Sequence, residues 1–219
     1  DLHVAATLPG FAIPNALAYD AAAQQLFVAT VRTGKIVSLD PKGGHDVLTF
    51  RPGVAAYGLG LHGGLLWAST AATRQTEGYD PAKPAASKIV AVDPKDGAVK
   101  VIATGGDDAQ FGHLLAGRDD LYVIDANHGA VLRLNGYAGE LQTLVPEGYM
   151  DSPQGLAENA DASVLIVADF ISGLYRVDLD TGAMTHLKAP DGVSLLGIAS
   201  LSVHGGDLIA VQNGFKPKK

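Results

Sequence analysis

Short apolar runs closed by turn-forming residues recur along the whole chain. The clearest set lies between Ser152 and Leu187, where four runs rich in Val, Ile, Leu and Tyr are separated by loops that hold Gly, Asp or Pro. Runs of this length and composition are typical of β-strands. Four in succession with tight links predict one antiparallel meander, which cannot bury both of its faces alone and therefore needs neighbours of the same kind.

The same unit repeats in steps of mostly 42 to 44 residues, and one longer step coincides with an insertion between Ala71 and Ser87. A small residue marks the start of the first strand in each unit: Ala16, Gly58, Gly112, Gly155 and Gly197. A repeat of about 40–45 residues with four strands per unit is the signature of a β-propeller blade. We therefore predict an all-β fold with almost no helix.

The repeats amount to four complete blades, half of a fifth and a lone apolar run at His3–Leu8 that resembles the fourth strand of a blade. A propeller ring closes when a strand from one terminus completes the blade built by the other. We therefore predict a single β-propeller domain over residues 1–219, six-bladed, with the last part of the ring missing from this chain. A five-bladed closure, in which the N-terminal strand lies beside Leu208–Gln212, is the alternative.

Composition narrows the classes of partner. Charged residues make up 18% of the chain and hydrophobic residues 47%, which is typical of a globular protein. The net charge is −7 and the longest basic cluster is Lys216–Lys219, so we expect no nucleic-acid partner. No apolar run reaches the ~18 residues that span a bilayer, so we expect no membrane partner.

The absence of cysteine bears on the cellular compartment. It fits a cytoplasmic protein and also a periplasmic or secreted one, and the first residue, Asp1, slightly favours the periplasm.

Three segments carry a family resemblance: Pro153–Leu156, Leu165–Asp169 and Gly173–Asp178. They resemble the blade repeat of the senescence-marker-protein/gluconolactonase superfamily, which strictosidine-synthase-like and NHL-repeat propellers share. The resemblance implies a propeller that binds a small polar ligand at the mouth of its central channel. It also implies a hydrolase of lactones or esters. The alternative is a non-catalytic propeller that serves as a scaffold for a protein or peptide partner, because one fold hosts unrelated functions.

The family resemblance also implies one divalent cation, usually calcium, held by a Glu, by Asn residues and by an Asp that acts as base. This sequence has Asn15 near the position of the Glu, Tyr57 and His113 near those of the Asn residues, and Gln154 in place of the Asp. A hard dication needs several oxygens, some of them charged. We therefore predict no cofactor, with a divalent cation such as calcium as the open alternative.

The residues that precede the first strands are the candidates for ligand binding. In the family these positions face the channel mouth, so we expect Asn15, Tyr57 and Gln154 to contact the ligand, together with the loop residue His128. The alternative is that they satisfy exposed backbone at a loop.

The candidates for catalysis are one histidine and two aspartates. We expect His113, Asp125 or Asp169 to activate water as a general base, and His113 and His128 to act together if both face the channel. Asp125 and Asp169 end second strands, where the alternative role is to cap the loop that follows.

Overall fold

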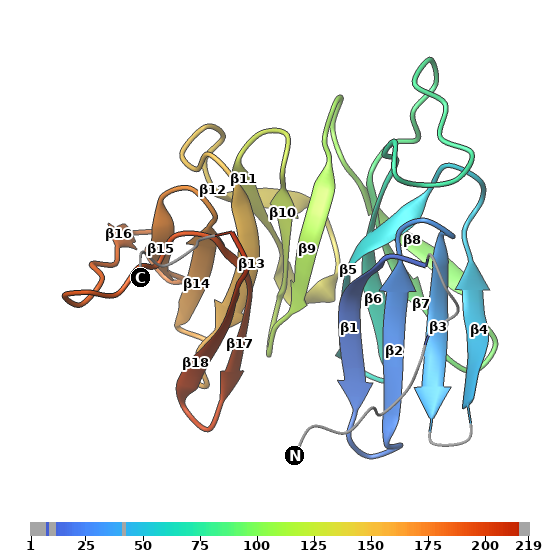
Figure 1. The fold of residues 1–219 in the computed structure, drawn as a ribbon, viewed down its shortest axis with the longest axis horizontal. Helices are drawn as coiled ribbons and strands as arrows, with labels where there is room; N and C mark the ends of the chain where they lie inside the picture. Colours follow the sequence, from blue (N-terminus) through green and yellow to red (C-terminus); the bar gives the residue numbers. More distant parts are fainter. Residues whose placement is uncertain (1–7, 9–11, 41–42, 215–219) are drawn as a thin grey trace. The chain divides into compact units, whose positions relative to one another are not determined.

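The structure is a computed structural model that describes Leu8 and residues 12–40 and 43–214. These residues form 18 β-strands and one 3-10 helix, Asn135–Tyr137 (Figure 1). The chain divides into two compact units, Asp1–Ala116 and Gly117–Lys219. The prediction of an all-β fold with almost no helix is confirmed over the described ranges.

The first unit contains two four-stranded antiparallel meanders and one further strand. The first sheet has the order β1 (Pro14–Asp20), β2 (Gln25–Thr30), β3 (Lys35–Asp40) and β4 (Gly43–Thr49). The second has the order β5 (Ala55–His62), β6 (Leu65–Ala71), β7 (Lys88–Val92) and β8 (Val99–Thr104). Strand β9 (Phe111–Ala116) ends the unit.

The second unit continues the same series. Strands β10 (Leu121–Asp125), β11 (Ala130–Leu134) and β12 (Leu141–Val145) pair consecutively. The next sheet has the order β13 (Pro153–Glu158), β14 (Val164–Asp169), β15 (Gly173–Asp178) and β16 (Met184–His186), and β17 (Ile198–His204) pairs with β18 (Asp207–Gln212). The strands predicted from the apolar runs are therefore confirmed.

The predicted N-terminal strand, His3–Leu8, lies outside the described residues except for its last member. Leu8 is partly buried against Val28, Val37 and Leu39 of the first sheet. Whether the preceding residues form a fourth strand of another blade stays a prediction.

The core of each unit lies between successive sheets. In the first unit, Phe27 and Ile36 of one sheet pack in a single cluster with Leu66 of the next, and all three are almost fully buried. In the second unit, Ala157 and Leu174 pack with Leu201 of β17. Burial of one sheet by the next is the reason why a lone meander would not suffice.

The small residues of the first strands allow neighbouring strands to approach closely. A Cβ atom on Gly58 of β5 would lie 2.2 Å from the backbone nitrogen of Leu114 in β9. A Cβ atom on Gly155 of β13 would lie 3.0 Å from the backbone nitrogen of Leu201 in β17. The repeated glycine therefore marks the contact between one blade and the next.

One repeat position differs from the prediction. In β13, Gly155 pairs with Ala168, and the residue in the same place in the β17–β18 ladder is Ser200, which pairs with Val211. Gly197 precedes β17 and donates its backbone N–H to the carbonyl of Phe170 at 2.8 Å. The spacing pointed to Gly197 because the connection between β16 and β17 is longer than those that lead to β5 and β13, which moves the equivalent position further along the chain.

Candidate functional site

The first strands β1, β5 and β13 share a β-bulge near their start, and β17 has one at the corresponding place. The register of the ladder shifts between Pro14 and Ala16 in β1, between Ala56 and Gly58 in β5, and between Pro153 and Gly155 in β13. The extra residues are three of the predicted ligand-binding residues: Asn15, Tyr57 and Gln154. A bulge takes its extra residue out of the ladder and re-aims the side chain, and it is frequent beside active sites.

In the first unit, two of these bulges are joined. The Asn15 side chain is exposed, and its Nδ2 donates a hydrogen bond to the backbone carbonyl of Tyr57 at 2.7 Å. The half-buried Tyr57 hydroxyl contacts the hydroxyls of Thr73 and Thr76, the latter at 3.5 Å. The Asn15 amide nitrogen therefore satisfies a backbone carbonyl, which is the alternative role considered for these residues. Its Oδ1 makes no hydrogen bond to another described residue.

The insertion between β6 and β7 is fastened to the neighbouring blade. The backbone N–H of Gly53 donates to the carbonyl of Glu77 at 2.8 Å, and the backbone N–H of Glu77 donates to the carbonyl of Arg32 at 3.0 Å. The Arg32 and Glu77 side chains add an ion pair of 3.1 Å. The insertion therefore covers the loops at the end of the first unit where the bulges lie.

His113 lies on β9 and is half-buried. Burial lowers the pKa of its imidazole to about 4. The ring is therefore neutral near pH 7, and its low basicity makes it a weak general base, since an efficient base has a pKa near the working pH.

Asp169, at the end of β14, acts as a loop cap. Its buried carboxylate accepts backbone N–H groups from Ser152 at 2.7 Å, Ile171 at 2.9 Å and Ser172 at 2.8 Å. Desolvation raises the pKa of Asp169, but these backbone hydrogen bonds outweigh it and hold the pKa below its usual value. The exposed Gln154 side chain contacts the Ser152 hydroxyl at 3.2 Å in the same loop.

Asp125, at the end of β10, combines a cap with a histidine partner. Its Oδ1 accepts the backbone N–H of Asn127 at 3.3 Å, and its Oδ2 lies 2.8 Å from Nδ1 of His128. The Asp125 side chain is 7% exposed and that of His128 is 29% exposed. In this arrangement the imidazole can act as a general base, and the buried carboxylate at its Nδ1 side orients the ring.

This pair lies beside the loop that leads to Gln154. A Cβ atom on Gly129 would lie 2.1 Å from the carbonyl oxygen of Met150, and the backbone N–H of Gly148 donates to the carbonyl of His128 at 2.8 Å. The β10–β11 loop and the β12–β13 loop are therefore in direct contact. The structure brings Asp125 and His128 together, whereas His113 belongs to the first unit.

Comparison with solved structures identifies the fold. The chain matches the nidogen/laminin complex with a TM-score of 0.73 at 14% identity, over 91% of this chain and 72% of the other. It matches a gluconolactonase from Xanthomonas campestris with a TM-score of 0.67 at 17% identity, over 91% of this chain and 69% of the other. The fold is a β-propeller. Both matched folds are six-bladed.

Other propellers of unrelated activity are also similar to this one. A streptogramin B lyase matches with a TM-score of 0.58 at 13% identity, over 92% of this chain and 76% of the other. No known protein family matches the sequence, and no curated protein sequence matches it. Identities this low show the fold alone, so the activity has to be argued from the residues of this propeller.

The bulge residues of this propeller do not fit a calcium ion. Asn15, Tyr57 and Gln154 are neutral, and the amide nitrogens of Asn15 and Gln154 are turned to protein oxygens. Across the part of the chain that the structure describes, no three His, Asp or Glu residues are grouped closely enough to hold a metal. Calcium takes six to eight oxygen ligands, some of them carboxylates, and these three residues do not supply such a set.

No helix within the described ranges is long and apolar enough to cross a membrane.

Proposed function

We propose that this propeller binds a small polar molecule at the blade ends where the first strands begin, and that it hydrolyses an ester or lactone there. The observation that supports the proposal is the contact between Asp125 and His128 beside the loop of Gln154. Both members of the pair are needed for one task, since the carboxylate fixes the ring and the imidazole moves the proton.

The chemistry follows from the geometry of the pair. Asp125 accepts the Nδ1–H of His128, which sets the tautomer in which Nε2 is the basic nitrogen that takes a proton from water. The hydroxide attacks the carbonyl carbon of the ester, and the tetrahedral intermediate breaks its bond to the leaving oxygen. His128 then returns the proton to that oxygen, so that the products are a carboxylic acid and an alcohol. The amide of Gln154 orients the polar body of the substrate.

The test is hydrolysis of a simple lactone and an aryl ester by the native chain and by His128→Gln. We expect the change to lower the turnover rate by about a hundredfold, as for loss of a general base. His204→Gln is the matched control, because His204 is an exposed histidine on β17 far along the chain from the pair. Equal rates for native and His128→Gln proteins would refute the hydrolase proposal.

A second candidate function is a non-catalytic scaffold that binds a peptide through the same blade ends. The neutral side chains of Asn15 and Gln154 support it, because the family resemblance implies carboxylates at these two positions. A native chain that hydrolyses neither substrate but loses a peptide partner on Tyr57→Ala would favour the scaffold over the enzyme.

A further inference from the structure

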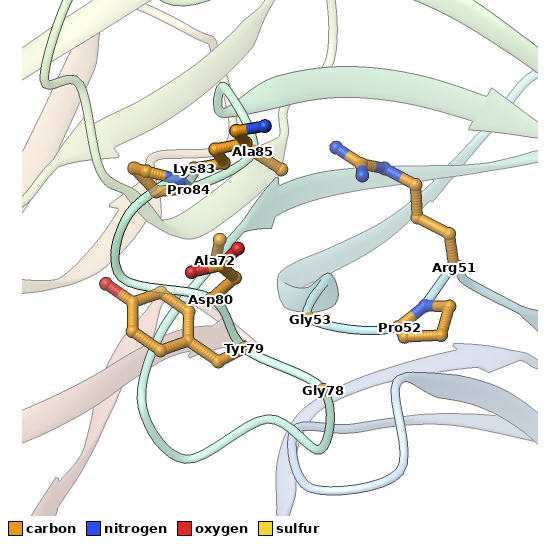
Figure 2. Close-up of a pocket in the computed structure, with 10 residues that line it drawn as sticks. All are labelled: Arg51, Pro52, Gly53, Ala72, Gly78, Tyr79, Asp80, Lys83, Pro84 and Ala85. Carbon is orange, nitrogen blue, oxygen red and sulfur yellow. The ribbon is translucent and has the colours of Figure 1, made fainter.

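A cavity of about 210 Å³ lies in the first unit, apart from the Asp125–His128 pair. It is lined by the turn Arg51–Gly53 between β4 and β5 and by the insertion between β6 and β7 (Figure 2). The insertion contributes Ala72 and the residues from Gly78 to Ala85, apart from Pro81 and Ala82. No feature of the sequence other than the length of the insertion indicated this cavity.

The walls of the cavity are fixed by close backbone contacts. Gly53 and Gly78 both have positive φ, and a Cβ atom on Gly53 would lie 2.8 Å from the carbonyl oxygen of Gly78. A Cβ atom on Gly78 would lie 2.6 Å from the Cβ of Pro52. The turn and the insertion therefore contact each other at positions where only glycine fits. Because these contacts fix the walls, the cavity is formed before a ligand binds.

The insertion wall is also held by its own hydrogen bonds. The Asp80 carboxylate accepts the backbone N–H of Ala82 at 2.9 Å, and the backbone N–H of Lys83 donates to the carbonyl of Asp80 at 3.2 Å. This turn places the Asp80 and Lys83 side chains on the same wall, next to Tyr79 (Figure 2).

Two cations face the cavity from opposite sides. The Arg51 side chain stands on one side and the Lys83 side chain on the other (Figure 2). Neither side chain forms an ion pair or hydrogen bond with a described residue, whereas Arg32 and Lys35 of the same unit are paired with Glu77 and Asp46. With Asp80, the lining groups sum to one positive charge in a protein whose net charge is −7.

We propose that this cavity binds a small organic monocarboxylate, with its carboxylate between Arg51 and Lys83. Guanidinium and ammonium groups both bind carboxylates through charge-assisted hydrogen bonds. Asp80 repels a second negative charge and accepts a hydroxyl of the ligand, so a hydroxy monocarboxylate is favoured over a phosphate dianion. At ~30 Å³ for each water in the liquid, the cavity has the volume of about seven waters, which is enough for a lactate ion and a few waters.

The experiment titrates the ¹⁵N-labelled chain with sodium lactate, inorganic phosphate or methylammonium chloride at constant ionic strength. The backbone amides of Gly53 and Gly78 report the cavity directly. We expect lactate to shift these amides with saturation, phosphate to bind more weakly, and methylammonium to leave them unchanged. Tighter binding of phosphate than of lactate, or no shift with lactate, would overturn the proposal.

One variant and a matched control variant separate a built site from general attraction of anions. Arg51→Gln removes one cation, and we expect about a tenfold weaker lactate affinity, as for loss of one charged hydrogen bond. Arg74→Gln removes an exposed arginine of the same insertion that does not line the cavity, and we expect no change. Equal weakening by both changes would overturn the proposal.

The third variant tests the role of Asp80. Asp80→Asn keeps the oxygen that accepts the N–H of Ala82 and removes the negative charge. We expect phosphate to gain affinity by more than lactate does, because the repulsion is greater for a dianion. An unchanged preference for lactate would show that Asp80 does not select the charge of the ligand and would overturn that part of the proposal.

Discussion

Individual side chains at equivalent places in this propeller carry different tasks. Asp125 and Asp169 both end second strands and both accept backbone N–H groups of the following loop. The Asp169 carboxylate accepts three backbone N–H groups, whereas one oxygen of Asp125 contacts Nδ1 of His128. The recurrence of a carboxylate could be predicted from the sequence, but its partner could not, because the loop conformation decides which side chain reaches the second oxygen.

At the scale of single residues, the lowered pKa of His113 leads to a prediction of how the unfolding free energy of the first unit depends on pH. Its pKa is lowered to about 4 by burial, so the unfolded chain binds a proton more readily than the folded one. The stabilisation from the neutral ring is complete above the unfolded pKa of about 6.5 and is lost as the pH falls from there to about 4. The loss is at most ~3 kcal/mol, reduced by the solvent that reaches the half-buried ring.

The measurement is chemical denaturation of the native chain and of His113→Phe at several pH values. We expect the difference in unfolding free energy between the two proteins to change between pH 6.5 and 4 and to be constant outside that window. His204→Phe, an exposed histidine, serves as the control and should show no such change. A constant difference for His113→Phe would contradict the assigned burial.

At the scale of elements, the short apolar runs closed by turn-forming residues were enough to predict the strands but not their bulges. A strand pattern has a period of two, and one extra residue changes the side on which later residues lie without removing the apolar run. The positions of Asn15, Tyr57 and Gln154 were therefore predicted from the repeat, while their shared geometry became apparent only in the ladder registers. The shift from Gly197 to Ser200 has a different cause, the longer connection between β16 and β17.

The glycines of β5 and β13 are predicted to be needed for the contact between blades. In Gly58→Ala the new Cβ would meet the backbone of Leu114 at 2.2 Å, so β5 and β9 must move apart. We expect a loss of about 1–3 kcal/mol in unfolding free energy, typical of overpacking in a core. Gly106→Ala is the matched control, since its Cβ would meet nothing within 4 Å. Equal stability of the two variants would show that the strands separate without cost.

At the scale of the molecule, the repeat length was the strongest signal. A repeat of a fixed length requires one supersecondary unit to stack on the next, and the match to six-bladed propellers over 72% and 69% of their chains confirms the fold. The repeat length does not indicate the function, because lactonases, lyases and binding proteins share the propeller fold. The sites proposed above use a few residues at blade ends and in the insertion, and the repeat does not determine which side chains stand there.

We expect calcium to stabilise this protein no more than magnesium does, because of the donor groups at the blade ends. Asn15, Tyr57 and Gln154 supply neutral oxygens, and a site of this kind gives a hard dication too little charge. A ligand that binds only the folded protein raises its stability by about 2.7 kcal/mol at a hundredfold excess over its Kd. We therefore expect millimolar calcium to move the thermal midpoint no further than millimolar magnesium does, because a chain of net charge −7 attracts both ions equally. A larger shift with calcium that Asn15→Ala or Gln154→Ala abolishes would establish a specific site.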